Sequence, residues 1–158
     1  MSLLDVFQAL ENTGFAVAFK ESPWAFAVTE SVHLLALSVM GGAVLLVDLR
    51  LLGLGLTSRP VRELGDEAWR WMTGALIVLI ATGLGLFLSE AVKCYYSTPF
   101  WVKMSTLLVA TLFTYTIRRR VVMGAAPEVG VSGKAIAVLS MLLWFVVAAS
   151  GRWIGYSG

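Results

Sequence analysis

Four long apolar stretches limit what this chain can fold into. They cover about residues 24–49, 69–91, 99–117 and 134–156. A helix rises about 1.5 Å per residue, so roughly 20 apolar residues cross the hydrocarbon core of a bilayer. The pattern therefore predicts an all-α integral membrane protein built as a four-helix bundle in the lipid bilayer.

The composition agrees with this class. Hydrophobic residues make up 58% of the 158 residues and charged residues 14%, and the mean hydropathy is +0.82. Four spans and short connections use nearly the whole length, so we expect one membrane domain over residues 1–158. The net charge is only +2, and the basic residues lie in connections without forming a stripe, which argues against a nucleic-acid partner.

The segment before the first span differs from a signal peptide. Asp5 and Glu11 interrupt its apolar residues, and no small-residue cleavage site follows a basic start. We expect a short amphipathic helix that lies on the membrane surface and is broken near Gly14. Pro23 then begins the first span, since proline is favoured in the first turn of a helix.

Basic residues in the connections predict the orientation. The first connection holds Arg59 and Arg62, and the third opens with Arg118, Arg119 and Arg120. Both connections lie on one side of a four-span protein, which the positive-inside rule places in the cytoplasm. Both termini are then expected to face outward.

The single histidine is the main candidate for a functional group. His33 lies about 13 Å inside the outward end of the first span, and an ionisable side chain at membrane depth is by default a functional candidate. One interpretation is axial ligation of haem iron. The other is a neutral imidazole hydrogen-bonded to Glu30 or Ser38. Cys94 is the only cysteine, which excludes a CxxC attachment motif, so any haem would be a non-covalent haem b.

Two cations are predicted near the same membrane leaflet as His33. Lys103 follows the start of the third span and Arg152 lies near the end of the fourth, so either could pair with haem propionates or an anionic substrate. Both could instead extend their charges to the membrane surface. Glu30 could orient a ligating imidazole, and Met104 completes the predicted cofactor-binding residues.

The chain has no second histidine to fill the sixth position of a haem iron. Met104 or Met40 could ligate, the iron could stay open to a small molecule, or an interface between protomers could complete the site. Glycines such as Gly41 and Gly42 would allow close helix packing, either inside the bundle or in a homo-oligomer.

Two other classes of function use the same residues. In a copper-handling or small-solute transport protein, His33, Glu30 and methionines would form a metal path without haem. In an accessory subunit, the polar residues would only lock the helices together. The Glu30–His33 spacing also occurs in di-iron bundles, but within the spans only Glu90 could add a further carboxylate, which argues against that site.

The remaining polar and aromatic residues within the spans are interpreted as structural. Asp48 and Arg50, near the inward end of the first span, are predicted to pair with Arg70 or Glu67. Trp144 lies deeper than the tryptophans at the span ends, and packing is its expected role, with the lining of a pocket as the alternative.

Several short segments together resemble a known family. They are Val32-His33-Leu34-Leu35, Asp48-Leu49-Arg50-Leu51-Leu52-Gly53, Thr82-Gly83, Phe100-Trp101-Val102-Lys103 and Gly151-Arg152-Trp153-Ile154-Gly155-Tyr156. Over about residues 24–156 the chain resembles a widespread bacterial family of small four-span membrane proteins of unknown function. The resemblance implies a multi-pass protein of the bacterial inner membrane.

That family is distantly similar to the small membrane protoporphyrinogen oxidases and to the membrane domain of copper-resistance proteins. In both, a histidine on an early span and a lysine opening a later one recur, which implies roles for His33 and Lys103. The oxidases carry a further histidine where this chain has Tyr115 and Thr116, a departure that argues against porphyrinogen oxidation. We therefore expect a cytochrome b-like protein in electron transfer or haem-linked oxidation, with a quinone or another redox partner.

Overall fold

The computed structural model describes residues 2–124 and 130–156, and every regular element within them is a helix. Four helical segments of this part of the chain are long and apolar enough to cross a membrane: Pro23–Leu52 (α3), Val61–Ser89 (α4), Thr98–Gly124 and Val131–Ile154 (α8). The third is a continuous run of α6 (Thr98–Phe113), the π-helical turn η1 (Thr114–Arg118) and α7 (Arg119–Gly124). The prediction of an all-α four-helix membrane bundle is confirmed.

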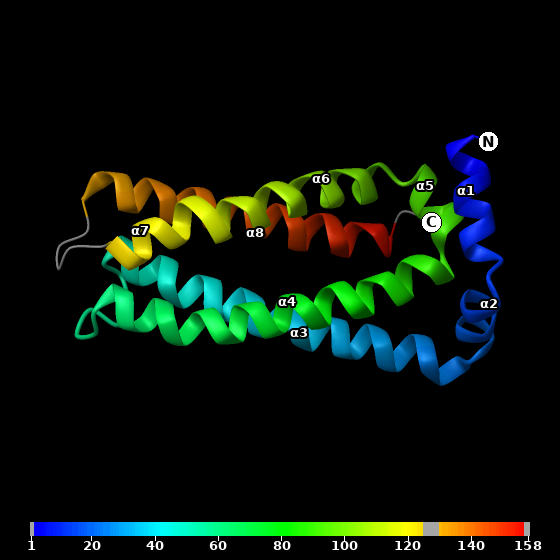
Figure 1. Cartoon of the computed structure of the whole chain (residues 1–158), viewed down its shortest axis with the longest axis horizontal. Coiled ribbons are helices and arrows are strands. Elements are labelled where there is room, and N and C mark those ends of the chain that lie inside the picture. The colour runs from blue at the N-terminus through cyan, green and yellow to red at the C-terminus, as the bar shows by residue number, and fades with distance from the viewer. Residues whose placement is uncertain (1, 125–129, 157–158) are drawn as a thin grey trace.

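The segment before the first span forms two short helices, α1 (Leu3–Glu11) and α2 (Gly14–Glu21), which separate next to Gly14 as predicted. Figure 1 shows both lying across one end of the bundle, beside the short helix α5 (Ala91–Tyr96). The Phe7 ring contacts Phe87 with ring centroids 5.4 Å apart. Glu11 accepts a hydrogen bond from the Val92 N–H at 2.8 Å, so the segment is fastened to α5.

Local signals set the ends of the first span. The Ser22 hydroxyl accepts a hydrogen bond from the Ala25 N–H at 3.3 Å, and Pro23 occupies the first turn of α3. The helix stops at Gly53, whose φ of 76° is a left-handed conformation that glycine adopts without steric cost. These two ends agree with the predicted start at Pro23 and extend the span to Leu52.

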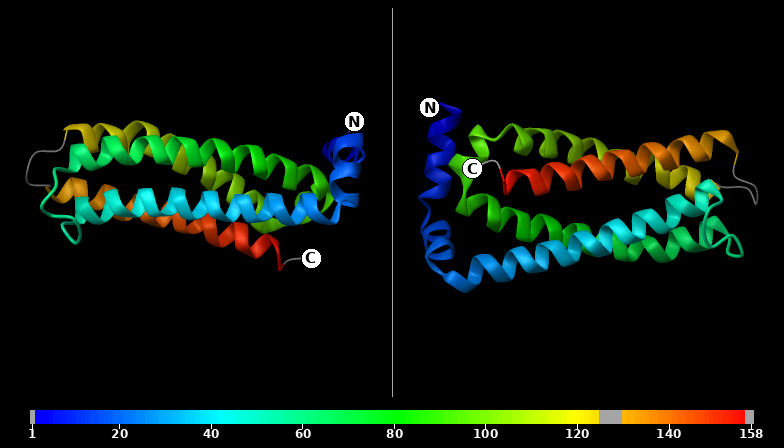
Figure 2. Two further views of the ribbon diagram at one scale, coloured as in Figure 1. Left: turned by 90° about the horizontal axis from the view of Figure 1, so that it is seen from below. Right: turned by 180° about the vertical axis from the view of Figure 1, so that it is seen from behind.

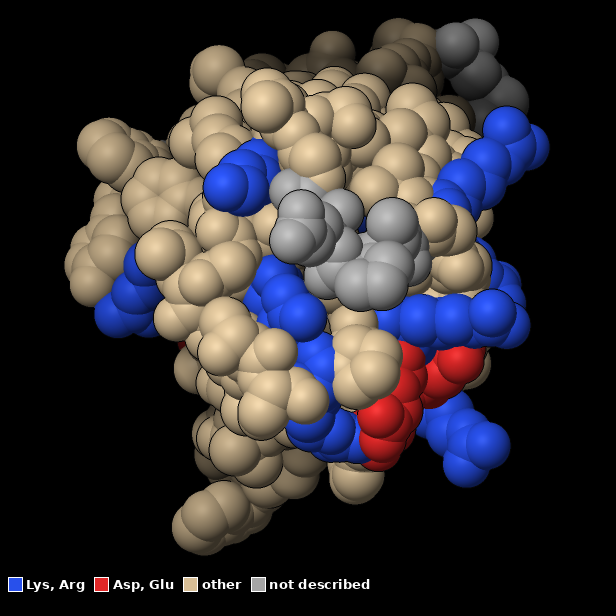
Figure 3. Space-filling view, turned by 90° about the vertical axis from the view of Figure 1, so that its left-hand side faces the viewer, with Lys and Arg blue, Asp and Glu red and all other residues tan. Residues whose placement is uncertain are grey.

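The two ends of the bundle differ in packing. We call the end with α1, α2, α5 and the last turn of α8 the terminal end, and the opposite end, where Lys and Arg side chains gather (Figure 3), the basic end. The buried apolar residues of the spans include Met40, Val44, Val47, Leu51, Leu64, Met72, Ala110, Ala137, Trp144 and Val147. No described residue is buried between Leu76 and Ser89 in α4, nor after Val147 in α8. The tightly packed core therefore occupies the basic half, and Figures 1 and 2 show α3 and α8 moving apart toward the terminal end.

A buried ion pair lies in this core. The Arg118 Nε donates to Asp48 Oδ1 at 2.7 Å, and the side chains of the two residues are 4% and 0% exposed. Arg118 also donates to the Val44 carbonyl at 3.2 Å and to the Met72 sulfur at 3.8 Å. The interpretation of Arg118 as part of a loop was wrong, because helix continues to Gly124 and the turn η1 directs Arg118 into the bundle.

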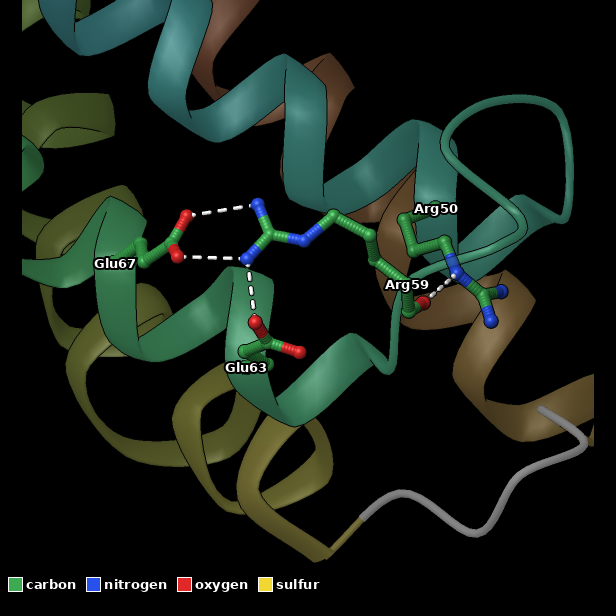
Figure 4. Close-up of polar contacts among 4 residues, drawn as sticks. All are labelled: Arg50, Arg59, Glu63 and Glu67. Atoms are coloured by element: carbon green, nitrogen blue, oxygen red, sulfur yellow. Dashed lines mark hydrogen bonds and ion pairs between the residues drawn. The ribbon is translucent and has the colours of Figure 1, made fainter.

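The connection between α3 and α4 has its own polar network, drawn in Figure 4. Arg59 pairs with Glu63 at 2.6 Å and with Glu67 at 2.7 Å, and the Arg50 Nε donates to the Arg59 carbonyl at 2.7 Å. The predicted pairing of Asp48 and Arg50 with Arg70 or Glu67 was therefore wrong. Glu67 is engaged by an arginine of the connection, and Asp48 points into the bundle instead.

We predict that Arg118→Met lowers the free energy of unfolding by about 3–5 kcal/mol, because it leaves the Asp48 carboxylate buried without a counter-charge. The double variant Asp48→Leu/Arg118→Met should recover most of this loss, since no buried charge remains. The measurement is unfolding in mixed detergent micelles. Arg120→Met, at an exposed arginine, is the control and should shift stability by about 0.5 kcal/mol or less. Equal stability of Arg118→Met and Arg120→Met would contradict the prediction.

Candidate functional site

His33 lies on the inner face of α3, one turn before the buried residue Ala36. Its ring is partly buried, and its Nδ1 lies 2.8 Å from the hydroxyl of Thr82 on α4. The two residues are 49 positions apart in the sequence. The bond joins α3 to α4 in the terminal half of the bundle, where little else between the spans is buried.

The hydrogen bonds of Thr82 determine which ring nitrogen of a neutral His33 carries the proton. The Thr82 hydroxyl has one hydrogen, and the Val78 carbonyl lies 2.6 Å from its oxygen and accepts it. When the hydroxyl gives its hydrogen to Val78, its oxygen accepts from His33, and Nδ1 is then the protonated nitrogen. This leaves the Nε2 lone pair available, and no described protein group hydrogen-bonds to it. An imidazole held through Nδ1–H with a free Nε2 is the usual form of a metal-ligating histidine.

Two glycines border these side chains. A Cβ atom at Gly83, next to Thr82, would lie 3.3 Å from the His33 Cε1. A Cβ at Gly151 on α8 would lie 3.4 Å from the Lys103 Nζ. Both glycines thus let a polar side chain of the neighbouring helix pass close to the backbone. His33 lies against Gly83 of α4, and Lys103 lies against Gly151 of α8.

Lys103 is close enough to His33 for the two side chains to interact electrostatically. It is partly buried, and no Asp or Glu of the described residues forms an ion pair with it. The Cys94 thiol of α5 is its other electrostatic neighbour. Burial raises the pKa of Cys94 to about 11, and the Glu90 carboxylate adds to the effect, so this thiol is neutral and supplies no negative charge. Among the described residues, no carboxylate pairs with this amine, so an anion is a candidate partner for it.

The structure does not bring the other predicted residues to His33. Arg152 is exposed, and its guanidinium donates to the Tyr156 hydroxyl at 2.8 Å, along the outside of α8. Glu30 is exposed on α3, and its carboxylate makes no hydrogen bond or ion pair with another described residue. The partner of His33 is therefore Thr82, where Glu30 or Ser38 was expected. Ser38 donates to a carbonyl of its own helix at 3.0 Å.

The two methionines considered as ligands lie elsewhere. The side chain of Met104 is 45% exposed on the outer face of α6. Met40 is fully buried two turns beyond His33, about 10 Å further along α3 in the core. Neither is positioned to share a ligand with His33 inside one chain.

Sequence reasoning missed Thr82 as a site residue and Arg118 as a buried one. Thr82 carried a weak signal, because a hydroxyl in the middle of an apolar span needs a hydrogen-bond partner. Trp144 is buried and donates to the Thr114 hydroxyl at 3.0 Å, so the packing role expected for it is the one observed. Tyr115, at the place where the oxidases carry a histidine, bonds to Thr73 of α4 at 3.1 Å.

The described residues contain no group of three or more His, Cys, Asp or Glu side chains arranged to hold a metal ion. The copper or zinc alternative, built on His33, Glu30 and a methionine, needs only two residues of these four types and stays a prediction. A hollow of about 330 Å³ lined by Asp66, Glu67, Arg70 and Trp71 lies at the basic end, at the other end of the bundle from His33.

Comparison with known proteins assigns a family. The model of a family of unknown function, DUF6644, matches residues 20–157. The chain belongs to this family. The DUF6644 region contains all four spans together with His33, Thr82 and Lys103, and it begins after α1. No curated protein and no solved structure matches the chain.

We predict that the neutral imidazole of His33 carries its proton on Nδ1. Because this DUF6644 protein has one histidine, ¹⁵N chemical shifts of histidine-labelled, metal-free protein report on that ring alone. Thr82→Val removes the acceptor and should produce a mixture of tautomers, whereas Ser38→Ala should leave the spectrum unchanged. A wild-type ring protonated on Nε2 would contradict the assignment.

Proposed function

We propose that this protein binds haem b non-covalently in the terminal half of its bundle, with His33 as an axial ligand, and that it serves in electron transfer or in a haem-linked oxidation. Haem supplies a one-electron couple or a site for oxygen chemistry, and the protein supplies the ligand, the charges and the apolar surroundings. The observation that carries the proposal is the free Nε2 of an imidazole fixed through its other nitrogen by Thr82.

The surroundings of His33 support a large planar ligand. The terminal halves of the four spans contribute almost no fully buried side chains. A ligand that moved or covered the side chains there would disturb little core packing. Aromatic rings on α4 and α6 border the same region, with Phe87 and Phe100 stacked at 5.5 Å. Such rings are suitable neighbours for a porphyrin face or edge.

The charge of Lys103 supports an anionic ligand in the same place. Haem b carries two propionates, and a half-buried ammonium that forms no ion pair with a described residue would pair with one of them. Arg152 could reach the other only by leaving its hydrogen bond to Tyr156. Lys103 is therefore proposed as the main propionate partner. Arg152, Glu30 and Met104 are exposed and would join the site only after their side chains move.

The sixth position has no protein ligand in this proposal. Met40 is held in the core and Met104 faces outward, so a small molecule or a second protomer remains for that position. Gly41 and Gly42 lie exposed on α3, with open space where a Cβ would lie, which would let two copies pack closely in a homo-oligomer.

The location proposed is the bacterial inner membrane, with both termini on the outer side. The basic end carries Arg59, Arg62, Arg119 and Arg120 even after Arg118 is counted as buried, which agrees with a cytoplasmic location for that end. The site would then lie in the outer leaflet, within reach of a quinone in the bilayer or of a redox protein outside the cell membrane.

The first prediction of this proposal concerns the chromophore. Protein purified from cells supplied with haem should show a Soret band, with about one haem per chain by pyridine haemochrome assay. His33→Ala should lose the band, because the axial nitrogen is removed, and added imidazole should restore part of it.

The matched control is Ser31→Ala, an exposed position on the same helix, which should keep the haem. Full haem retention in His33→Ala would refute the ligand assignment. A colourless wild-type protein would refute the proposal itself, and elemental analysis for copper would then test the metal-handling alternative.

The second prediction concerns Lys103. Lys103→Met keeps the apolar stem and removes the charge, so it should lower haem occupancy. Because a nearby cation favours the reduced iron, the variant should also lower the reduction potential. Redox titration of Lys103→Met and of the control Lys93→Met, whose charge pairs with Glu90 at 3.7 Å, measures the difference. Arg152→Met should have a smaller effect. Equal potentials and occupancy for both lysine variants would contradict the propionate role.

A further inference from the structure

The two ends of the bundle carry different charge. Outside the core, the described cations of the basic end are Arg50, Arg59, Arg62, Arg70, Arg119, Arg120 and Lys134, and the described carboxylates are Glu63, Asp66 and Glu67. At the terminal end Lys20 is paired with Glu11 and Lys93 with Glu90. Figure 3 shows the basic end as several blue side chains around one small red area.

Most of the described carboxylates of the basic end already form ion pairs. Arg59 engages both Glu63 and Glu67, and Arg50 donates to a backbone carbonyl. The remaining cations are exposed and form no ion pair with a described residue: Arg62, Arg70, Arg119, Arg120 and Lys134. We call these five residues the basic rim. Of the described carboxylates outside the core at this end, Asp66 is the one that forms no ion pair.

The rim lies where apolar helices meet a polar surface. Arg62 and Lys134 are in the first turns of α4 and α8, and Arg119 and Arg120 are in α7. The Arg119 guanidinium lies over the Trp69 ring, 3.8 Å from its centroid. Trp71, two residues further along α4, is 68% exposed. Tryptophans of membrane proteins concentrate at the depth of the lipid headgroups. The rim therefore lies at that depth.

We propose that the basic rim binds the phosphate groups of anionic phospholipids. A guanidinium offers paired N–H donors that match two phosphate oxygens. In a zwitterionic lipid, the trimethylammonium group partly screens the charge of the phosphate, so an anionic lipid should bind more strongly. Lipid phosphates occupy the headgroup layer next to the rim at high local concentration, and clusters of Lys and Arg beside a span bind them through charge. The stack on Trp69 holds one of the guanidinium groups in place for this contact.

The test is electron spin resonance of the purified protein in bilayers that contain spin-labelled phosphatidylglycerol or spin-labelled phosphatidylcholine. The motionally restricted fraction gives the relative affinity for the two lipids. Wild type should prefer phosphatidylglycerol, and high salt should weaken the preference. Arg119→Gln/Arg120→Gln should reduce it by about fivefold for each arginine removed.

The control is Lys20→Gln/Lys93→Gln, which changes the net charge equally at the terminal end and should keep the wild-type preference. If Arg119→Gln/Arg120→Gln fails to fold, Arg62→Gln/Lys134→Gln on the same rim replaces it. An equal loss in the rim and control variants would overturn the proposal in favour of net charge alone. No preference in wild type would overturn it too, and an acidic protein would become the candidate occupant. None of these outcomes depends on haem.

Discussion

The buried pair of Asp48 and Arg118 is the interaction on which the packing of the spans depends. Arg118 reaches two groups of α3 and the Met72 sulfur of α4, while Ser140 of α8 lies beside Asp48. Separating these groups inside a membrane would leave an uncompensated charge in a medium of low dielectric constant, which is far costlier than losing an apolar contact. The pair therefore restricts how α3 and the third span can slide or rotate against each other.

Close packing around this pair has a consequence at the other end of the bundle. The helices lie close together in the basic half and move apart toward the terminal end, so the terminal half has few buried side chains. In that half His33 is held by its hydrogen bond to Thr82, and Lys103 passes close to the Gly151 backbone, without a filled core around them. A region built this way can take up a ligand without disrupting the part that holds the protein together. The helices α1, α2 and α5 close its outer end through the Phe7 and Glu11 contacts.

Much of the fold was predictable because the bilayer imposes a strong length and composition rule. The four spans, the break near Gly14 and the helix start at Pro23 all follow from local sequence. The third span was predicted too short because three consecutive arginines resemble a loop. Only the turn η1, which directs the first of them inward, shows that Arg118 belongs to the core. Asp48 gave no signal for choosing this partner among several nearby arginines.

The sequence by itself determined the membrane class, the number of spans, the single histidine and the exclusion of a CxxC haem attachment, because these depend on residue type and apolar length. The tertiary structure decided which groups meet. It paired His33 with Thr82 where Glu30 was expected, kept Lys103 partly buried while Arg152 is exposed, and turned Met104 outward. Helical periodicity specifies the face on which a residue lies, whereas the rotation and crossing of helices distant in sequence specify what that face meets.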